Sequence, residues 1–329
     1  MEELYCMAKQ EKRIELPSLE EIMTAYSHVS QILPPTPLVP LHQKFSDKEI
    51  FLKLENFNPF GSFKVRAAYN ILLSERERLD GKSLITASAG NFGQGLAYVA
   101  KELGRPITIV VPETSSKVKM DSMEKLGATL IKLPFAEWWK VLSERYYPGL
   151  KGEFIHPVAE WGTILGNATI GVEIANQMPD VDAIIAPYGG GGLITGIGSV
   201  VKKMLPNTLV YAAETEASTP LSTALAMGEP VKVDHKKTYI DGMGGIRVLD
   251  DMWPLVTQVV SDVICVPVEE VSSAIRSLAL DNNIIAEGAG AASVAAGMSD
   301  QAGKGKIVCI VSGGNIDMDI FHNIICGKL

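Results

Sequence analysis

Cysteine is scarce in this sequence, and the few cysteines lie far apart. The 329 residues contain four, at Cys6, Cys265, Cys309 and Cys326, without a CxxC pair or a cysteine–histidine spacing. This pattern argues against both a disulfide framework and a zinc site. Reduced thiols are typical of cytoplasmic proteins, so we expect a cytoplasmic location.

A long apolar run and an excess of positive charge are also missing. Glycine, proline or charged residues interrupt the apolar stretches well before the roughly 20 residues that cross a bilayer. The charged first residues do not resemble a signal peptide. The formal net charge is −8, whereas nucleic-acid binding requires concentrated lysine and arginine. We therefore expect neither a membrane nor a nucleic acid as a partner.

What the sequence does contain is an alternation of short apolar runs with helix-like segments. This alternation predicts an α/β fold with mostly parallel sheets. Breaks rich in glycine, proline and charge at 79–82 and 147–152 suggest two domains. The strand-like runs are 50–54, 83–87, 107–111, 129–133, 183–186, 210–213 and 307–311, and the helix-like segments are 93–103, 115–126, 193–204 and 316–325.

The most informative segment is 58–68, NPFGSFKVRAA, because it places Lys64 between a glycine turn and an amphipathic helix. The backbone at such a junction can orient the amine. Lysine amines that form Schiff bases or act as bases need an oriented, desolvated site. The alternative is an ordinary surface lysine that opens a helix, so other segments must decide.

A run of four glycines, Gly189, Gly190, Gly191 and Gly192, follows the strand-like run that ends at Pro187. Backbone N–H groups can converge there on an anion, and the next helix adds the positive end of its dipole. The run lacks the lysine and the spacing of a P-loop. A tight turn is the alternative, but four glycines exceed what a turn needs, which favours a phosphate site.

Two further turns carry polar groups after strand-like runs. The segment SAGN at 88–91 suits an anion such as a carboxylate, but it also suits an ordinary helix cap. The segment SGGN at 312–315 offers a hydroxyl to a ring nitrogen, with a cap and turn as the alternative. Glu287, among small residues, fits close helix packing as well as function. A phosphate, a ring nitrogen and a carbonyl for Lys64 together describe pyridoxal phosphate.

With these motifs the sequence resembles the fold-type II pyridoxal-phosphate enzymes, the tryptophan synthase β-like group. It most resembles the threonine/serine dehydratase and serine racemase branch, from PTPL at 35–38 to SGGN at 312–315. The resemblance implies two domains, each a mostly parallel twisted sheet with helices on both faces, and a homodimer. It implies a large cofactor-binding domain at 1–80 and 152–329 and a small mobile substrate-side domain at 81–151.

The resemblance also implies roles for single residues. Lys64 would hold the cofactor as a Schiff base and, once freed, act on the substrate Cα proton. Phe63 would flank the ring, Asn91 would bond the ring hydroxyl and Ser312 would face the ring nitrogen. Phosphate binding would fall to Gly189, Gly190, Gly191, Gly192 and Leu193, and substrate binding to Ser88, Ala89, Gly90, Asn91 and Phe92.

The implied reaction is β-elimination (dehydration and deamination) of a hydroxy amino acid such as L-threonine or L-serine, giving a 2-oxo acid and ammonia. The alternatives are β-replacement of the cysteine synthase kind, racemisation, or an inactive sensor on the same scaffold. Racemases of the group carry a serine base where this chain has Ala89, which favours elimination.

Other departures affect the substrate and a cation. Phe60 and Phe92 stand where threonine and histidine are common, and GNAT at 166–169 replaces GQGT, so the substrate could be bulkier than threonine. Glu214 matches one ligand of the cation site found in some members. The aspartate position is Pro220, which leaves the oxygen ligands one short, so a divalent cation stays an open question.

Overall fold

The computed structural model describes residues 14–88 and 90–329. Within this part of the chain, the strands form two sheets. The six-stranded sheet has the order β1 (Leu38–Pro40), β2 (Lys48–Leu54), β10 (Gly305–Val311), β7 (Ala183–Pro187), β8 (Leu209–Thr215) and β9 (Asp262–Val266). The four-stranded sheet has the order β5 (Thr129–Leu133), β4 (Ile107–Pro112), β3 (Leu84–Ala87) and β6 (Glu153–Phe154).

Helices surround both sheets. Three short 3-10 helices are η1 (Glu55–Phe57), η2 (Pro59–Gly61) and η3 (Asp300–Ala302). The α-helices are α1 (Leu19–Ser30), α2 (Lys64–Ser74), α3 (Arg76–Leu79), α4 (Asn91–Glu102), α5 (Lys117–Lys125), α6 (Phe135–Glu144), α7 (Trp161–Gln177), α8 (Gly192–Met204), α9 (Pro220–Met227), α10 (Trp253–Val259), α11 (Val268–Asn282), α12 (Gly288–Met298) and α13 (Met318–Ile325).

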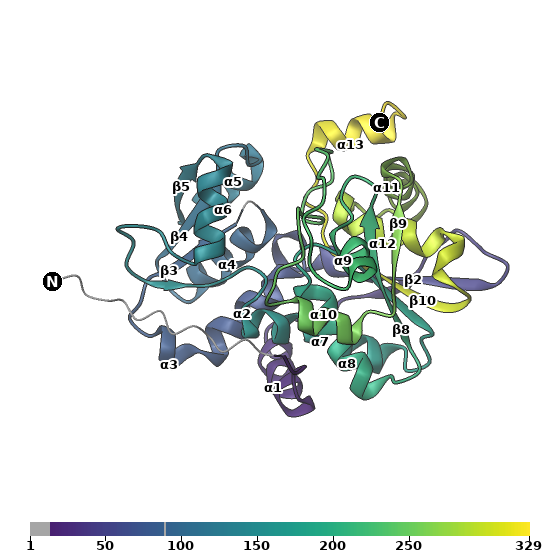
Figure 1. Cartoon of the computed structure of the whole chain (residues 1–329), viewed down its shortest axis with the longest axis horizontal. Helices are drawn as coiled ribbons and strands as arrows, with labels where there is room; N and C mark the ends of the chain where they lie inside the picture. Colours follow the sequence, from purple (N-terminus) through teal and green to yellow (C-terminus); the bar gives the residue numbers. More distant parts are fainter. Residues whose placement is uncertain (1–13, 89) are drawn as a thin grey trace.

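The molecule has two lobes (Figure 1). The four-stranded sheet with α4, α5 and α6 forms the small lobe. The six-stranded sheet with α7, α8, α11 and α12 forms the large lobe, and α2 lies between the two. The strands of the small lobe run from residue 84 to residue 154, and the proposed domain limits at 81–151 stay a prediction.

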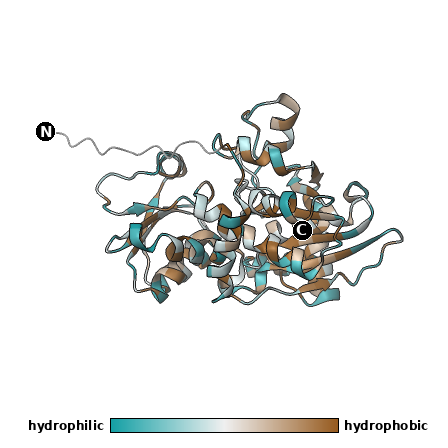
Figure 2. Ribbon diagram, turned by 90° about the horizontal axis from the view of Figure 1, so that it is seen from below, coloured by the Kyte–Doolittle hydropathy of each residue, from teal (hydrophilic) through white to brown (hydrophobic). Residues whose placement is uncertain are grey.

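The six-stranded sheet is buried on both faces because helices cover both. In β10, Val308 and Ile310 pack with the core that includes α7 and α8, whereas Ile307, Cys309 and Val311 pack with the core that includes α11 and α12. Alternate side chains of a strand point to opposite faces, so a doubly covered strand is apolar throughout. Figure 2 shows the resulting concentration of hydrophobic residues inside the large lobe.

The expected strands and helices are confirmed, with small shifts of their limits. The helix expected at 93–103 begins at Asn91, and the helix expected at 316–325 begins after Asp317, whose side chain accepts a hydrogen bond from the N–H of Asp319. Within residues 14–88 and 90–329, all strand pairs are parallel except β1 with β2, as a mostly parallel fold requires. None of the helices in the described part of the chain is long and apolar enough to cross a bilayer.

Candidate active site

The strand order of the large sheet brings three of the sequence motifs to one edge. β10 lies between β2 and β7, and all three are parallel, so their carboxyl ends adjoin. Lys64 follows β2, Ser312 follows β10 and Gly189 follows β7. The carboxyl edge of a parallel sheet is where ligands of such folds bind.

Lys64 is the first residue of α2 and is partly exposed. Its Nζ lies 4.7 Å from the centre of the Phe63 ring and 5.9 Å from that of Phe92. Burial lowers the pKa of this amine to about 8, although the charge of Glu287 opposes the shift. The low pKa raises the fraction of neutral, nucleophilic amine near physiological pH, which the chemistry of a Schiff-base lysine requires.

The turn at 312–315 holds the start of α2 in place. The N–H of Phe63 donates to the carbonyl of Ser312 at 3.1 Å, and the N–H of Gly314 donates to the carbonyl of Gly61 at 2.9 Å. Asn315 Nδ2 donates to the carbonyl of Phe60 at 2.7 Å. The backbone that precedes Lys64 is therefore held by this turn, and buried Ser312 is bonded to Phe63, the residue before Lys64.

The glycine run forms a tight turn and also packs closely against Val158. Gly191 caps α8 with φ of 94°, a left-handed value that favours glycine. A Cβ on Gly190 would lie 2.6 Å from Val158 Cγ1, and one on Gly192 would lie 3.0 Å from the Val158 carbonyl oxygen. The tight-turn alternative thus accounts for part of this run.

Packing does not account for the polar atoms beside the run. Asn167 lies 3.6 Å from the position of a Cβ on Gly192, and the Tyr188 hydroxyl lies 3.5 Å from that of a Cβ on Gly191. These two side chains and Thr195, in the first turn of α8, have buried polar atoms without a hydrogen-bond partner in the described part of the chain. Unpaired buried donors are costly, and an anion held by the run would give them a partner.

Ser88 bonds to N–H groups at the start of α4, as in the helix-cap alternative for the segment 88–91. Ser88 Oγ accepts hydrogen bonds from the N–H of Gly93 at 3.0 Å and, more weakly, from the N–H of Gly90 at 3.4 Å. Ala89, assigned to the substrate site on the sequence, lies outside the described residues. The binding of a substrate carboxylate at this turn stays a prediction.

Asn91 joins the small lobe to the large one. Its Nδ2 donates to Glu287 Oε1 at 2.6 Å, and its Oδ1 accepts from Asn315 Nδ2 at 2.9 Å. Glu287 is buried, which raises its pKa to about 7, although Lys119 opposes the shift. The Glu287 carboxylate was left undecided between packing and function, and its contacts place it in the network around Lys64.

The two phenylalanines that depart from the family pattern occupy different positions. The Phe92 ring is buried and faces Lys64. The Phe60 ring packs on Tyr98 with ring centres 4.8 Å apart, and its backbone has φ of 56°. Of the two, Phe92 lies against the reactive amine and is the better candidate for a residue that shapes the substrate site.

Glu214 caps a helix in this structure. Its carboxylate accepts from the N–H of Leu221 at 2.6 Å and from the N–H and hydroxyl of Ser222 at 3.0 and 2.7 Å, at the start of α9. In residues 14–88 and 90–329, no group of three or more His, Cys, Asp or Glu side chains is arranged to hold a metal ion. These contacts give the carboxylate a structural role.

Comparison with known proteins identifies the family to which this site belongs. A family model described as pyridoxal-phosphate dependent enzyme matches residues 29–313. The chain belongs to this family. Its predicted cofactor, enzyme class and fold are thereby confirmed.

Three relatives show which branch of the family is similar. An L-threonine ammonia-lyase of Thermotoga maritima is 36% identical over 319 residues, covering 94% of this chain and 78% of the relative. Serine racemase of Homo sapiens is 31% identical over 313 residues, covering 92% of each chain. The structure of maize serine racemase aligns with a TM-score of 0.85 at 28% identity, covering 96% of this chain and 100% of that one.

The residues present fit pyridoxal phosphate. Lys64 supplies the amine, and the glycine run with Leu193 at a helix N-terminus supplies a phosphate site beside unpaired polar atoms. Phe63 lies against Lys64, while Asn91 and Ser312 are brought to the same edge. Their individual contacts with the cofactor stay predictions.

Two residues of the network were not found from the sequence. Lys119 Nζ lies 2.6 Å from Asp241 Oδ2 and 3.8 Å from Glu287 Oε2. Lys119 belongs to a helix with several lysines and Asp241 to an irregular segment, so neither position has a local signal that separates it from an ordinary surface charge.

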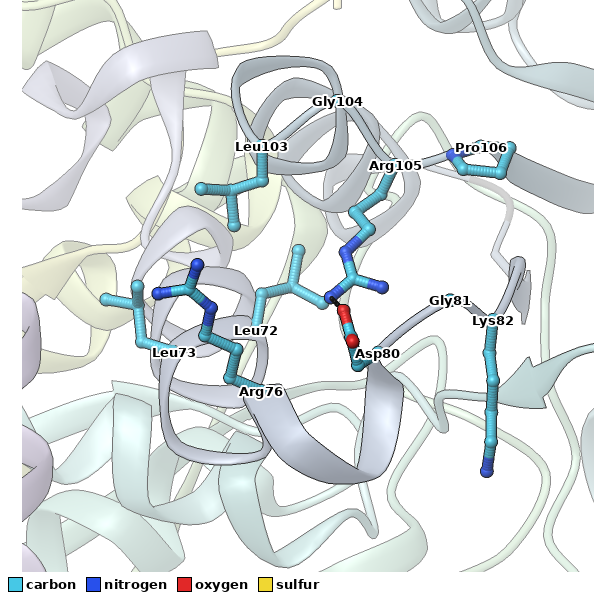
Figure 3. A pocket seen from close by; sticks show the side chains of 10 residues that line it. All are labelled: Leu72, Leu73, Arg76, Asp80, Gly81, Lys82, Leu103, Gly104, Arg105 and Pro106. Carbon is cyan, nitrogen blue, oxygen red and sulfur yellow. Dashed lines mark hydrogen bonds and ion pairs between the residues drawn. The ribbon is translucent and has the colours of Figure 1, made fainter.

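A surface pocket of about 440 Å³ lies elsewhere, between the end of α2, α3 and the turn after α4 (Figure 3). Two of its three cations are already paired: Arg105 donates to Asp80 at 3.4 Å, and Lys82 donates to Glu153 at 2.5 Å. We assign no ligand to it. The pocket is lined by Leu72, Leu73, Arg76, Asp80, Gly81, Lys82, Leu103, Gly104, Arg105 and Pro106.

Proposed function

We propose that the chain catalyses the β-elimination of a hydroxy amino acid such as L-threonine or L-serine to a 2-oxo acid and ammonia. The observation that carries the proposal is the low-pKa amine of Lys64 at a sheet edge shared with the glycine run. The similarity to a threonine ammonia-lyase supports the same reaction.

The bound cofactor supplies an electron sink for the charge that develops at Cα. Lys64 takes up the Cα proton, because its amine is poorly solvated and its lowered pKa, about 8, lies near the working pH of a general base. The glycine run and Leu193 bind the phosphate, and Ser312 and Asn91 orient the ring. The turn at 88–91 binds the substrate carboxylate.

The rings of Phe63 and Phe92 limit the access of water to Lys64. A drier site strengthens the electrostatic interactions on which proton transfer depends. Phe92 in place of the usual histidine also makes this side of the site apolar, which supports a substrate whose β-substituent is larger than a hydrogen or is itself apolar.

Racemisation is the second candidate, because serine racemases are among the relatives. It requires an acid–base group on the face of Cα opposite Lys64, and Ala89 has none where those enzymes carry serine. We therefore expect elimination to be faster than racemisation on the same substrate. β-Replacement would instead incorporate an added thiol into the product.

Replacing Lys64 tests the proposal directly. The Lys64→Ala protein should lose both turnover and the visible absorbance band that borohydride bleaches, because the variant lacks the amine that forms the Schiff base. Lys202→Ala, an exposed lysine near the end of α8, is the matched control and should retain both. A Lys64→Ala protein that kept the band and turnover would refute the assignment.

A substrate panel tests the reaction itself. Serine, threonine, hydroxyaspartate and phenylserine should be supplied as separate stereoisomers, with 2-oxo acid, ammonia and the enantiomer measured in each case. At least one should give equal amounts of 2-oxo acid and ammonia. Production of the enantiomer alone, or of a thiol adduct without ammonia loss to 2-oxo acid, would contradict the proposal.

We also infer that the protein is a cytoplasmic homodimer. The scattered cysteines support a reducing compartment, and Cys265, Cys309 and Cys326 are free thiols in the structure. Light scattering should give twice the chain mass of 35.5 kDa; a monomer would contradict the inference.

A further inference from the structure

Lys119 is a buried cation in a helix whose neighbouring lysine is exposed. The Lys119 side chain is 7% exposed, whereas that of Lys117 on the same helix is 82% exposed and pairs with Asp121. A buried ammonium is costly unless anions compensate for its lost hydration. Its partners therefore indicate why the chain holds a lysine at this position.

Both partners belong to the other lobe. Asp241 lies in the segment between α9 and α10, and Glu287 directly precedes α12. Burial alone would lower the pKa of Lys119, but Glu287 and Asp241 outweigh burial and raise it, so the amine is charged at neutral pH. An ion pair 2.6 Å long thus joins the two lobes.

The ammonium also lies beside the turn that we assign to the substrate carboxylate. A Cβ on Gly90 would lie 3.6 Å from both Cδ and Nζ of Lys119. Glu287, the second anion near Lys119, accepts the hydrogen bond from Asn91, the next residue of the same turn. Lys119 therefore lies beside the turn and pairs with the carboxylate that holds the turn to the large lobe.

The residues that follow Asp241 pack against the glycine run. Gly242 follows Asp241, and its carbonyl oxygen would lie 3.1 Å from a Cβ on Gly189. The N–H of Gly244 donates to the carbonyl of Tyr188 at 2.8 Å. The segment that receives the Lys119 ion pair is thus the segment that packs against the proposed phosphate site.

We propose that Lys119 is a positioning residue for the elimination, acting through its ion pair with Asp241 and its contact with Glu287. It holds the carboxylate turn of the small lobe at a set distance from Lys64 and the glycine run of the large lobe. The inference rests on the proposed function, since the turn must bind the substrate for its position to affect the rate.

Kinetics of the cofactor-loaded enzyme provide the first test. Lys119→Met should raise KM by about tenfold or more and lower kcat, because one close charge interaction is worth about that factor. Lys117→Met should match the parent protein. Lys119→Arg, which keeps the charge, should recover part of the loss, and adding Asp241→Asn to Lys119→Met should cost little more.

A second measurement does not depend on the reaction. In hydrogen exchange of the loaded enzyme, Lys119→Met should speed exchange selectively at the start of α4 and at 240–244, and Lys117→Met should not. This result can be obtained even if no amino acid is eliminated, so failure of the proposed function remains distinguishable.

Three outcomes would overturn the proposal. The first is equal behaviour of Lys119→Met and Lys117→Met in both measurements. The second is equal loss in Lys119→Met and Lys119→Arg, which would show that the charge has no part. The third is faster exchange spread evenly over the four-stranded sheet, which would show that Lys119 only stabilises the small lobe.

Discussion

Lys64 and Glu287 both have pKa values displaced toward neutrality, and for the same reason. Burial disfavours the charged form of each group, which lowers the pKa of Lys64 to about 8 and raises that of Glu287 to about 7. Such displacement suits proton transfer at a working site. Burying these two ionisable groups also lowers the stability of the folded protein when the cofactor is absent.

Glu287→Gln should stabilise the cofactor-free protein at pH 8 and have a much smaller effect near pH 5. The pKa of Glu287 is about 7 when folded, against 4.5 as its usual value. A carboxyl group whose pKa is higher in the folded than in the unfolded protein stabilises the fold below the unfolded pKa. This stabilisation is lost as the pH rises through the folded pKa. The gain at pH 8 is about 3 kcal/mol at most.

Thermal unfolding at the two pH values measures this effect. Glu269→Gln, which changes an exposed carboxylate on α11, is the control and should shift neither midpoint. A gain from Glu287→Gln that is the same at pH 5 and pH 8 would mean that the ionisation of Glu287 is not its cause.

The residue types at these positions were readable from the sequence to different degrees. Lys64 was found because a glycine turn and an amphipathic helix flank it. Glu287 stayed undecided because small neighbours fit packing and function equally well. Its role became visible only through its contacts with Asn91 and Lys119, each more than 150 residues away in the chain.

Among the elements, the strand–glycine–helix unit from β7 to α8 has little space for side chains at its glycines. Val158 fills the space beside the glycines, and it is held there by a turn in which His156 Nδ1 accepts from the N–H groups of Val158 and Ala159 at 3.1 and 2.9 Å. Burial lowers the pKa of His156 to about 3, so its ring remains a neutral acceptor.

Gly190→Ala should therefore weaken cofactor binding by about tenfold or more. The added methyl would lie 2.6 and 2.7 Å from the two Cγ atoms of Val158, which forces the run to shift. Combining it with Val158→Ala should restore part of the affinity, since the methyl then has space. Absorbance titration with the cofactor would measure the affinity of the single and the double variant, with Val158→Ala alone as the baseline. A double variant that recovers no affinity would contradict the packing argument.

The elements themselves were largely predictable because their signals are local. Strand β10 reads as one apolar run, and α8 begins at the last glycine of its run. The small-residue helix α12 was not predicted, because its pattern GAGAASVAAGM lacks the polar face that marks a surface helix. It lacks that face because it is buried against the large sheet.

At the scale of the whole molecule, a buried ion cluster surrounds the first turn of α2. Arg66 donates to Glu55 at 2.7 Å and to Glu173 at 2.6 Å, and Lys53 donates to Glu173 at 2.6 Å. The cluster joins the end of β2, α2 and α7, and α2 is the helix between the two lobes in Figure 1. It therefore fixes the helix that begins with Lys64.

Arg66→Met should destabilise the protein by about 3–5 kcal/mol, because two buried carboxylates would keep only one cation. Arg247→Met, which removes an exposed pair with Asp250 2.8 Å long, should change stability by about 1 kcal/mol or less. Denaturant unfolding with the cofactor bound would compare them, and similar losses would show that burial does not strengthen the cluster.

The sequence by itself determined the local features of this protein: the order of strands and helices, the lysine at the start of α2 and the glycine run before α8. Each of these features depends on residues that are close in the sequence, so the local sequence pattern predicts it. Only the tertiary structure decided the Lys119–Asp241–Glu287 contacts. Charged residues on a surface helix or loop have the same local pattern whether water or a distant carboxylate is their partner, and packing of the two lobes makes that choice.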